Sequence, residues 1–198
     1  MRTTTLLVFA ALVLFSLGCD PKKDPATPQE QDFSCIKLFD DTGQTWGLHG
    51  DCSSSNDWGN IALSSTENAL LNFSDTVSLN GTVAVAITQF AIAPCPVKID
   101  AALHLYVIGV SPDQDVKLKL AIVDESLNVV QQLAIRINTG GGLALHIDPS
   151  KFESGKYYRM YYRVSASGAT SLYEGYGNFL VCSTYIDGVN TTIESDCL

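Results

Sequence analysis

One strand-like run, Lys156–Val164 (KYYRMYYRV), holds the side chains best suited to binding another molecule. Because side chains alternate across a strand, one face carries Tyr157, Arg159, Tyr161 and Arg163, and the other carries Tyr158, Met160 and Tyr162. A guanidinium costs more to bury than a phenol ring, so we expect the arginine-bearing face to be exposed. Tyrosines beside arginines can stack on sugar rings or on a protein surface. The alternative is that both tyrosine sets pack within the sandwich, with their hydroxyl groups at its rim.

Residues of catalytic types occur, but not in a catalytic pattern. The three histidines are His49, His104 and His146, and the last two are flanked by apolar residues in strand-like runs. No GxSxG, HExxH or P-loop motif is present. The glycines at 140–142 precede no helix pattern, which favours a hairpin over a phosphate-binding loop. We therefore expect no enzymatic activity and no cofactor.

A metal site is not expected either. Acidic and amide side chains of the kind that bind calcium crowd one loop beside Trp58, namely Asp51, Asn56, Asp57 and Asn60. Their spacing is not that of an EF-hand, so a polar turn is the simpler interpretation. The cysteines form no CxxC pair, and no histidine stands at zinc-ligand spacing from two of them.

The N-terminus has the arrangement of an export signal. Arg2 precedes an uncharged apolar run, Leu6–Leu17, which is too short to span a bilayer as a helix but suits the core of a signal peptide. The sequence Ser16-Leu17-Gly18-Cys19 resembles the lipobox of bacterial lipoproteins, in which signal peptidase II cuts before a diacylated cysteine. The resemblance implies a signal peptide over residues 1–18, a lipid anchor on Cys19, and a place in the outer membrane, facing the periplasm or the cell surface. The alternative is an ordinary secretory signal, with Cys19 in a disulfide.

Six cysteines fit an oxidising compartment. With Cys19 assigned to lipid, an odd number remains, so at most two bridges form and one thiol is left over: Cys35, Cys52, Cys95, Cys182 and Cys197. Cys35–Cys52 is the favoured first pair, because a turn at 40–43 brings the two flanks together. Cys182–Cys197, closing a C-terminal loop, is the favoured second pair. Cys95–Cys182 is its rival.

The remainder of the chain reads as one β domain behind a linker. Residues 20–32 (DPKKDPATPQEQD) are polar and proline-rich, so 19–32 is predicted to be the lipidated cysteine and a flexible tether. Apolar and aromatic runs separated by turn residues follow, and the only helical signal is a capping box at Ser64 and Glu67. We predict an all-β, antiparallel, immunoglobulin-like β-sandwich with little helix over 33–198, made of N-terminal strands 33–90 and an immunoglobulin-like half 91–198.

The second half carries a more specific resemblance. Pro94-Cys95-Pro96 precedes a strand, Asp124–Asn128 forms a turn between two strands, and Gly155-Lys156-Tyr157 leads into another. This order resembles the small immunoglobulin-like C-terminal domain of proteins secreted by the type IX system of Bacteroidota. The resemblance implies the sandwich fold. It does not extend to the sorting signal, since Cys95 and Asn128 replace the usual Asn and Gly and the basic tail is missing.

Together these features predict a membrane-attached, non-enzymatic binding or assembly module with a protein or glycan partner at the cell surface. The alternative is a glycan-binding accessory lipoprotein of a polysaccharide-uptake system, and a hydrolase is a third, disfavoured class. The formal charge of −9 and the scattered basic residues exclude nucleic acid as a partner.

Overall fold

The computed structural model describes residues 32–50, 52, 58–79, 85–167 and 171–184. The predicted signal peptide, Cys19, the linker up to residue 31 and Cys197 lie outside these ranges. From Asp32 onward the chain forms one compact unit. Of the described residues, 51% are in strands and 4% in helix, which is the composition expected of an all-β protein.

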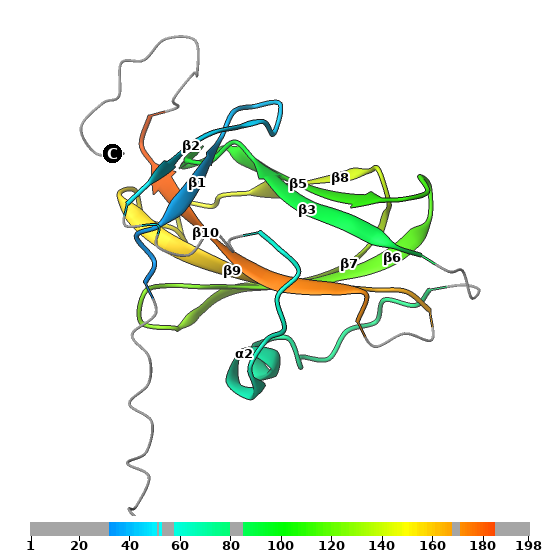
Figure 1. The fold of residues 1–198 in the computed structure, drawn as a ribbon. Helices are drawn as coiled ribbons and strands as arrows, with labels where there is room; N and C mark the ends of the chain where they lie inside the picture. The colour runs from blue at the N-terminus through cyan, green and yellow to red at the C-terminus, as the bar shows by residue number, and fades with distance from the viewer. Residues whose placement is uncertain (1–31, 51, 53–57, 80–84, 168–170, 185–198) are drawn as a thin grey trace, which may run out of the picture. The chain divides into compact units, whose positions relative to one another are not determined.

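Two β-sheets stacked face to face make up the body of this unit (Figure 1). The smaller sheet has three strands, in the order β3 (Ile87–Ala93), β5 (Ala102–Gly109) and β8 (Gly142–His146). The larger sheet has five, in the order β4 (Val97–Lys98), β10 (Tyr173–Cys182), β9 (Lys156–Ser165), β6 (Asp115–Val123) and β7 (Val129–Asn138). Neighbouring strands are antiparallel except β4 and β10, which run parallel.

The order in which the chain visits the sheets is that of an immunoglobulin-like sandwich. β3, β5 and β8 stand in the places of strands A, B and E, while β6, β9 and β10 stand in those of C, F and G. The predicted fold class is therefore confirmed. The turn at Thr139–Gly141 differs from its prediction, because it carries the chain from one sheet to the other and does not close a hairpin.

Alternation of side chains along β6 and β9 fills the space between the sheets. Every second residue of β6 faces inward, from Val116 to Ile122. In β9 the inward set is the predicted one: Tyr158, Met160 and Tyr162 are 4%, 0% and 0% exposed. The ring of Tyr162 stacks on that of Phe90 in β3, with centroids 4.1 Å apart, so these two aromatic side chains join the two sheets.

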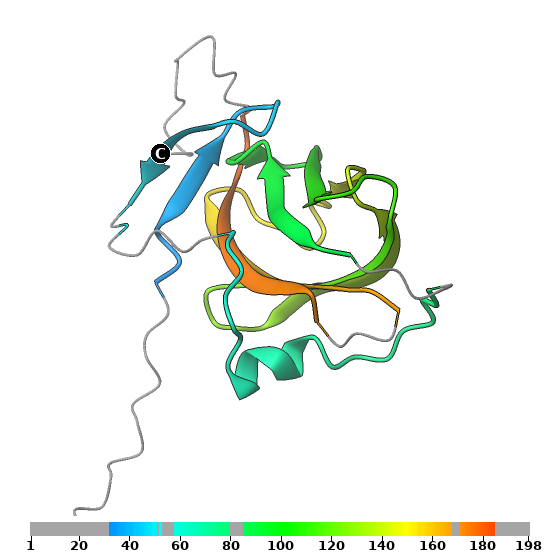
Figure 2. The same cartoon turned by 45° about the vertical axis from the view of Figure 1, so that its right-hand side comes forward.

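A short hairpin, β1 (Ile36–Phe39) and β2 (Thr45–His49), closes one end of the sandwich (Figure 2). Its Phe39 exchanges two backbone hydrogen bonds with Cys95, of 2.9 and 3.0 Å. Ile36, Leu38 and Phe39 are buried in the main core. The disulfide Cys35–Cys52, with Cα atoms 5.0 Å apart, ties the two ends of the hairpin together and confirms the first predicted pair.

The remaining cysteines separate the two alternatives for a second bridge. Cys95 carries a buried thiol, so the pairing Cys95–Cys182 is wrong. Cys182 is disulfide-bonded, and its predicted partner Cys197 lies outside the described residues.

Among the described residues, helix is confined to one short element. α2 (Ser65–Leu70) begins at the predicted capping box, in which Ser64 and Glu67 each accept a hydrogen bond from the other's backbone N–H. Within the described ranges, no helix has the length and apolar character needed to cross a membrane.

The side chain of Trp58 packs between the two sheets beside β10. Its ring lies 6.0 Å from that of Phe90 and 6.1 Å from that of Tyr162. The backbone N–H of Trp58 donates to the carbonyl of Tyr176 at 2.9 Å, which fixes this segment along the edge of β10. Gly177 makes the contact possible, since a Cβ atom there would lie 2.2 Å from the indole ring.

We predict that Gly177→Ala displaces Trp58 and destabilises the fold by about 1–3 kcal/mol, the usual cost of overpacking a core. Urea unfolding followed by tryptophan fluorescence measures both effects. Gly47→Ala is the matched control, since a Cβ atom in that strand would make only a 3.4 Å contact with the end of the Leu38 side chain. Unchanged stability and emission in Gly177→Ala would contradict the assigned position of Trp58.

Candidate functional site

The predicted binding face of β9 is covered in the structure. Tyr161 is fully buried and Arg159 is only 5% exposed, while Tyr157 and Arg163 are partly buried. The prediction of an exposed tyrosine–arginine face is therefore wrong. The alternative, that both tyrosine sets pack within the sandwich, holds for Tyr158 and Tyr162, whereas Tyr161 packs on the outer face of the sheet. The alternation of side chains correctly predicts which residues of β9 face the core, but the opposite face of the strand is buried beneath other parts of the chain.

Arg159 shows how a charged side chain is accommodated on this buried face by residues at the start of the domain and on β10. Its guanidinium donates to the side-chain oxygen of Asn178 at 2.7 Å and to the backbone carbonyl of Asp32 at 2.6 Å. It also lies between two aromatic rings, 4.5 Å from the centroid of Phe33 and 4.7 Å from that of Tyr176. Hydrogen bonds and cation–π contacts thus replace the water that burial removes.

The cover is residues 58–77, which we call the covering segment. It runs with α2 across the outer face of the five-stranded sheet (Figure 1). Its Leu63 and Leu71 form a second apolar cluster with Tyr161 and Val123 of the sheet. This cluster is separate from the main core and explains why the outward residues of β6 and β9 are buried.

Polar contacts hold the same segment along its length. Asp75 forms ion pairs with Lys117 at 3.4 Å and Lys119 at 2.9 Å. Lys119 also donates to the carbonyl of Phe73 at 2.6 Å, and Arg163 donates to the side-chain oxygen of Asn68. The hydrogen bond from Lys119 is the main reason that the pKa of the Asp75 carboxyl lies below its ordinary value, with the backbone N–H of Val77 and the two lysine charges adding to it.

The outer face of the three-stranded sheet has no such cover among the described residues. Three outward side chains of β5 lie in a row on it: His104, Tyr106 and Ile108. On the neighbouring strands, Ala91 and Gly142 lie opposite Tyr106, and Ala93 and Ala144 lie opposite His104. The aromatic side chains therefore rise above small neighbours on both sides.

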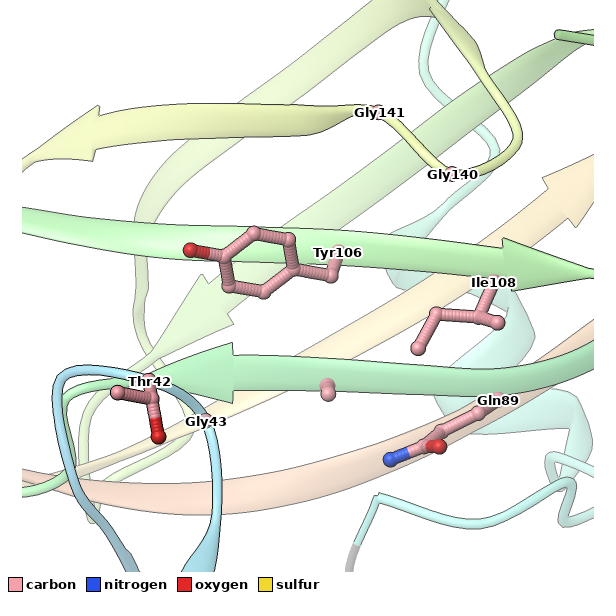
Figure 3. Close-up of a pocket in the computed structure, with 8 residues that line it drawn as sticks. Thr42, Gly43, Gln89, Tyr106, Ile108, Gly140 and Gly141 are labelled. Atoms are coloured by element: carbon pink, nitrogen blue, oxygen red, sulfur yellow. The ribbon is translucent and has the colours of Figure 1, made fainter. Parts of the chain in front are cut away.

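A groove of about 460 Å³ crosses this face (Figure 3). Its floor is Tyr106, Ile108 and Ala91, with Gln89 beside them on β3. The turn between β1 and β2 borders it with Thr42 and Gly43, and the turn between β7 and β8 borders it with Gly140 and Gly141. Its volume falls in the range of small-molecule binding sites, about 300–1,000 Å³.

The lining of the groove is suited to binding. It contains an aromatic ring, an aliphatic side chain, an amide and a hydroxyl group, together with the backbone of three glycines. None of the eight lining residues carries a formal charge, and none forms a nucleophile–base pair of the catalytic kind. The groove can therefore stack on a ligand and exchange neutral hydrogen bonds with it.

The other sequence candidates lie apart from this groove. His146 faces Asp100 at 3.5 Å in an exposed pair, and Asn60 of the predicted polar turn accepts a hydrogen bond from the N–H of Glu174. Asp51, Asn56 and Asp57 lie outside the described residues. Among those that are described, no three histidine, cysteine or acidic side chains gather as metal ligands.

The groove is not among the sites predicted from the sequence, because the apolar residues that flank His104 indicate only a strand. The parity of that strand held a signal: His104, Tyr106 and Ile108 alternate with Leu103, Leu105 and Val107, and the structure buries the second set completely. Polar or amphipathic aromatic residues at alternate positions indicate a strand with one solvent-exposed face.

Comparison with known proteins gives little further information. No protein-family model matches the chain, and no curated protein matches it. Among solved structures, a glycosyl hydrolase family 2 member from Bacteroides cellulosilyticus is similar over 48% of this chain and 14% of its own, with 15% identity and a TM-score of 0.34. This partial similarity assigns no activity to the present chain.

We predict that Asp75→Asn loosens the covering segment and lowers the stability by about 1–2 kcal/mol at neutral pH, the range for a hydrogen-bonded, partly exposed ion pair. The lowered pKa of the Asp75 carboxyl sets the direction of the pH dependence. The stability that the carboxylate contributes is fully present above the ordinary Asp pKa of 3.8 and is lost as the pH falls through the lower folded-state pKa. The difference from wild type should therefore shrink in acid.

Urea unfolding at several pH values measures this difference. Asp113→Asn removes the same charge from an exposed turn away from the covering segment and is the control. A loss of stability in Asp75→Asn that persists unchanged in acid would show that the carboxylate charge is not what holds the segment.

Proposed function

We propose that this chain is a lipid-anchored envelope protein whose sandwich is a non-catalytic binding module, with the outer face of the three-stranded sheet as its binding surface. One observation carries the proposal. The chain's own residues 58–77 cover the outer face of the five-stranded sheet, whereas the opposite face presents the groove over Tyr106.

The chemistry of the groove supports binding over hydrolysis. Hydrolysis of a glycosidic bond ordinarily needs two carboxyl groups, and acyl transfer needs a nucleophile beside a base. The residues that line this groove offer hydroxyl, amide and aromatic groups. These can orient a ligand but supply neither reaction with its acid and base.

The start of the domain supports the tethered arrangement. The backbone carbonyl of Asp32 accepts hydrogen bonds from Arg159 at 2.6 Å and from Asn178 at 3.2 Å, and the carbonyl of Cys35 accepts another from Asn178 at 3.0 Å. The polar linker from Cys19 would therefore join the domain at a fixed point, and the groove would be presented at the end of a flexible spacer.

Acylation of Cys19 is tested by feeding cells an alkyne-bearing fatty acid and detecting label on the protein. We expect label on the wild type. Cys19→Ala should be unlabelled and should either remain unprocessed or appear in the soluble fraction. Cys95→Ala is the control, because it removes a different cysteine that lies buried in the domain. An unlabelled wild-type protein would refute the lipid anchor.

The binding surface is tested by photo-crosslinking in intact cells. A photoreactive amino acid is placed at Ile108 in the groove, which is 39% exposed, or at Val129 on β7, which is 46% exposed. We expect adducts with protein or glycan to form at Ile108 and to be scarce at Val129, since the two positions differ in location more than in exposure. Equal adducts at both positions, or none at either, would contradict the proposed surface.

A further inference from the structure

We propose that the groove over β5 binds a neutral carbohydrate chain, which stacks on the Tyr106 ring in the groove and continues onto the ring of His104, beside Tyr106 on the same strand. This inference rests on the proposed function, because it names the ligand class for the same sheet face. Three features of that face carry it: the geometry of the two rings, the hydrogen-bonding groups beside them, and the charge of the surroundings.

The two rings are nearly parallel neighbours on β5. Their centroids are 6.4 Å apart and their planes differ by 21°, so the rings stack next to one another along the strand. Figure 3 shows the ring of Tyr106 nearly face-on above its strand. The C–H face of a sugar ring is apolar and packs on such an aromatic face, while the hydroxyl groups around it stay free to form hydrogen bonds.

Small neighbours are what allow the rings to lie flat. A Cβ atom on Gly142 would lie 3.2 Å and 3.3 Å from two atoms of the Tyr106 ring, which shows how closely the ring approaches that backbone. On the other side of Tyr106 stands Ala91. A bulky side chain at either place would tilt the ring or cover its face, so the surrounding sequence keeps the platform accessible.

Neutral polar groups stand along the platform. Gln89 projects from β3 with an amide that can both donate and accept hydrogen bonds (Figure 3). The hydroxyl of Thr42 donates to Asp40 at 2.7 Å, which leaves its oxygen to accept a hydrogen bond from a ligand. Sugar hydroxyl groups are donors and acceptors at once, so they match this pair of partners.

The charge of the surface selects against an anionic ligand. The groove lining is uncharged, the turn that borders it contains Asp40 and Asp41, and the whole chain carries a formal charge of −9. An acidic polysaccharide or nucleic acid would be repelled. The groove volume of about 460 Å³ lies in the range of sites for small ligands, about 300–1,000 Å³. A neutral saccharide satisfies both limits.

The test uses the mature chain with its disulfides intact and a panel of linear hexasaccharides of glucose, mannose and xylose, with polygalacturonate as the anionic probe. Saturation-transfer NMR detects binding, and calorimetry measures affinity. We expect at least one neutral hexasaccharide to bind and polygalacturonate not to bind. Tyr106→Ala and His104→Ala should each weaken binding at least tenfold, whereas Tyr106→Phe and His104→Phe, which keep a ring, should stay within threefold of wild type.

Val129→Ala, an exposed change away from the groove, is the matched control and should leave affinity unchanged. Urea unfolding of each variant shows that the fold is retained. Absence of binding to every neutral probe, preference for polygalacturonate, or full affinity in Tyr106→Ala would overturn the inference. If no saccharide binds but Ile108 crosslinks a protein in cells, the ligand class is wrong and the binding module stands. If Ile108 gives no selective adduct, the proposed function itself fails.

Discussion

The buried guanidinium of Arg159 is the constraint on which the arrangement of this domain depends. A charge removed from water must be matched by hydrogen bonds and nearby polarisable groups, or the cost exceeds the stability of a small domain. Here the partners are the carbonyl of Asp32, the amide of Asn178 and the rings of Phe33 and Tyr176. Satisfying Arg159 therefore fixes the first residues of the domain against β9 and β10, next to the hairpin closed by the Cys35–Cys52 disulfide.

The other cationic side chains on that sheet face are also paired with polar groups, most of them on the covering segment. Lys117 and Lys119 meet Asp75, and Arg163 meets Glu174 and Asn68. Leu63 and Leu71 add apolar contacts with Tyr161. Individual ion pairs at a surface contribute little, but a row of them over an apolar cluster holds a segment that has only one short helix. As a consequence, one side of the sandwich is occupied by the chain itself, which is why the proposed binding surface lies on the opposite sheet.

On the opposite sheet, the rings of Tyr106 and His104 are accessible because the neighbouring strands carry no bulky side chains beside them. The alanine and glycine residues beside Tyr106 and His104 contribute almost no side-chain surface, so the rings face solvent. The two bordering turns come from different parts of the chain, one from the hairpin β1–β2 and the other from the connection between the sheets. The groove thus exists only where the hairpin, held by Phe39 and Cys95, reaches the face of β3.

The sequence by itself determined the fold class, the core parity of β9, the capping box at Ser64 and the Cys35–Cys52 bridge, because each depends on local spacing: alternation along a strand, a reciprocal cap, or a turn between two cysteines. The sites were decided by tertiary structure. The same alternation that placed Tyr158 and Tyr162 inside marked Arg159 and Tyr161 as outside. It carried no information that Asp32 and Phe33 would cover Arg159, or that Leu63 and Leu71 would pack on Tyr161. Likewise, Tyr106 and Ile108 form the floor of a groove only because the sheet register sets alanine and glycine beside Tyr106. Contacts between strands distant in sequence depend on pairing that no local pattern encodes.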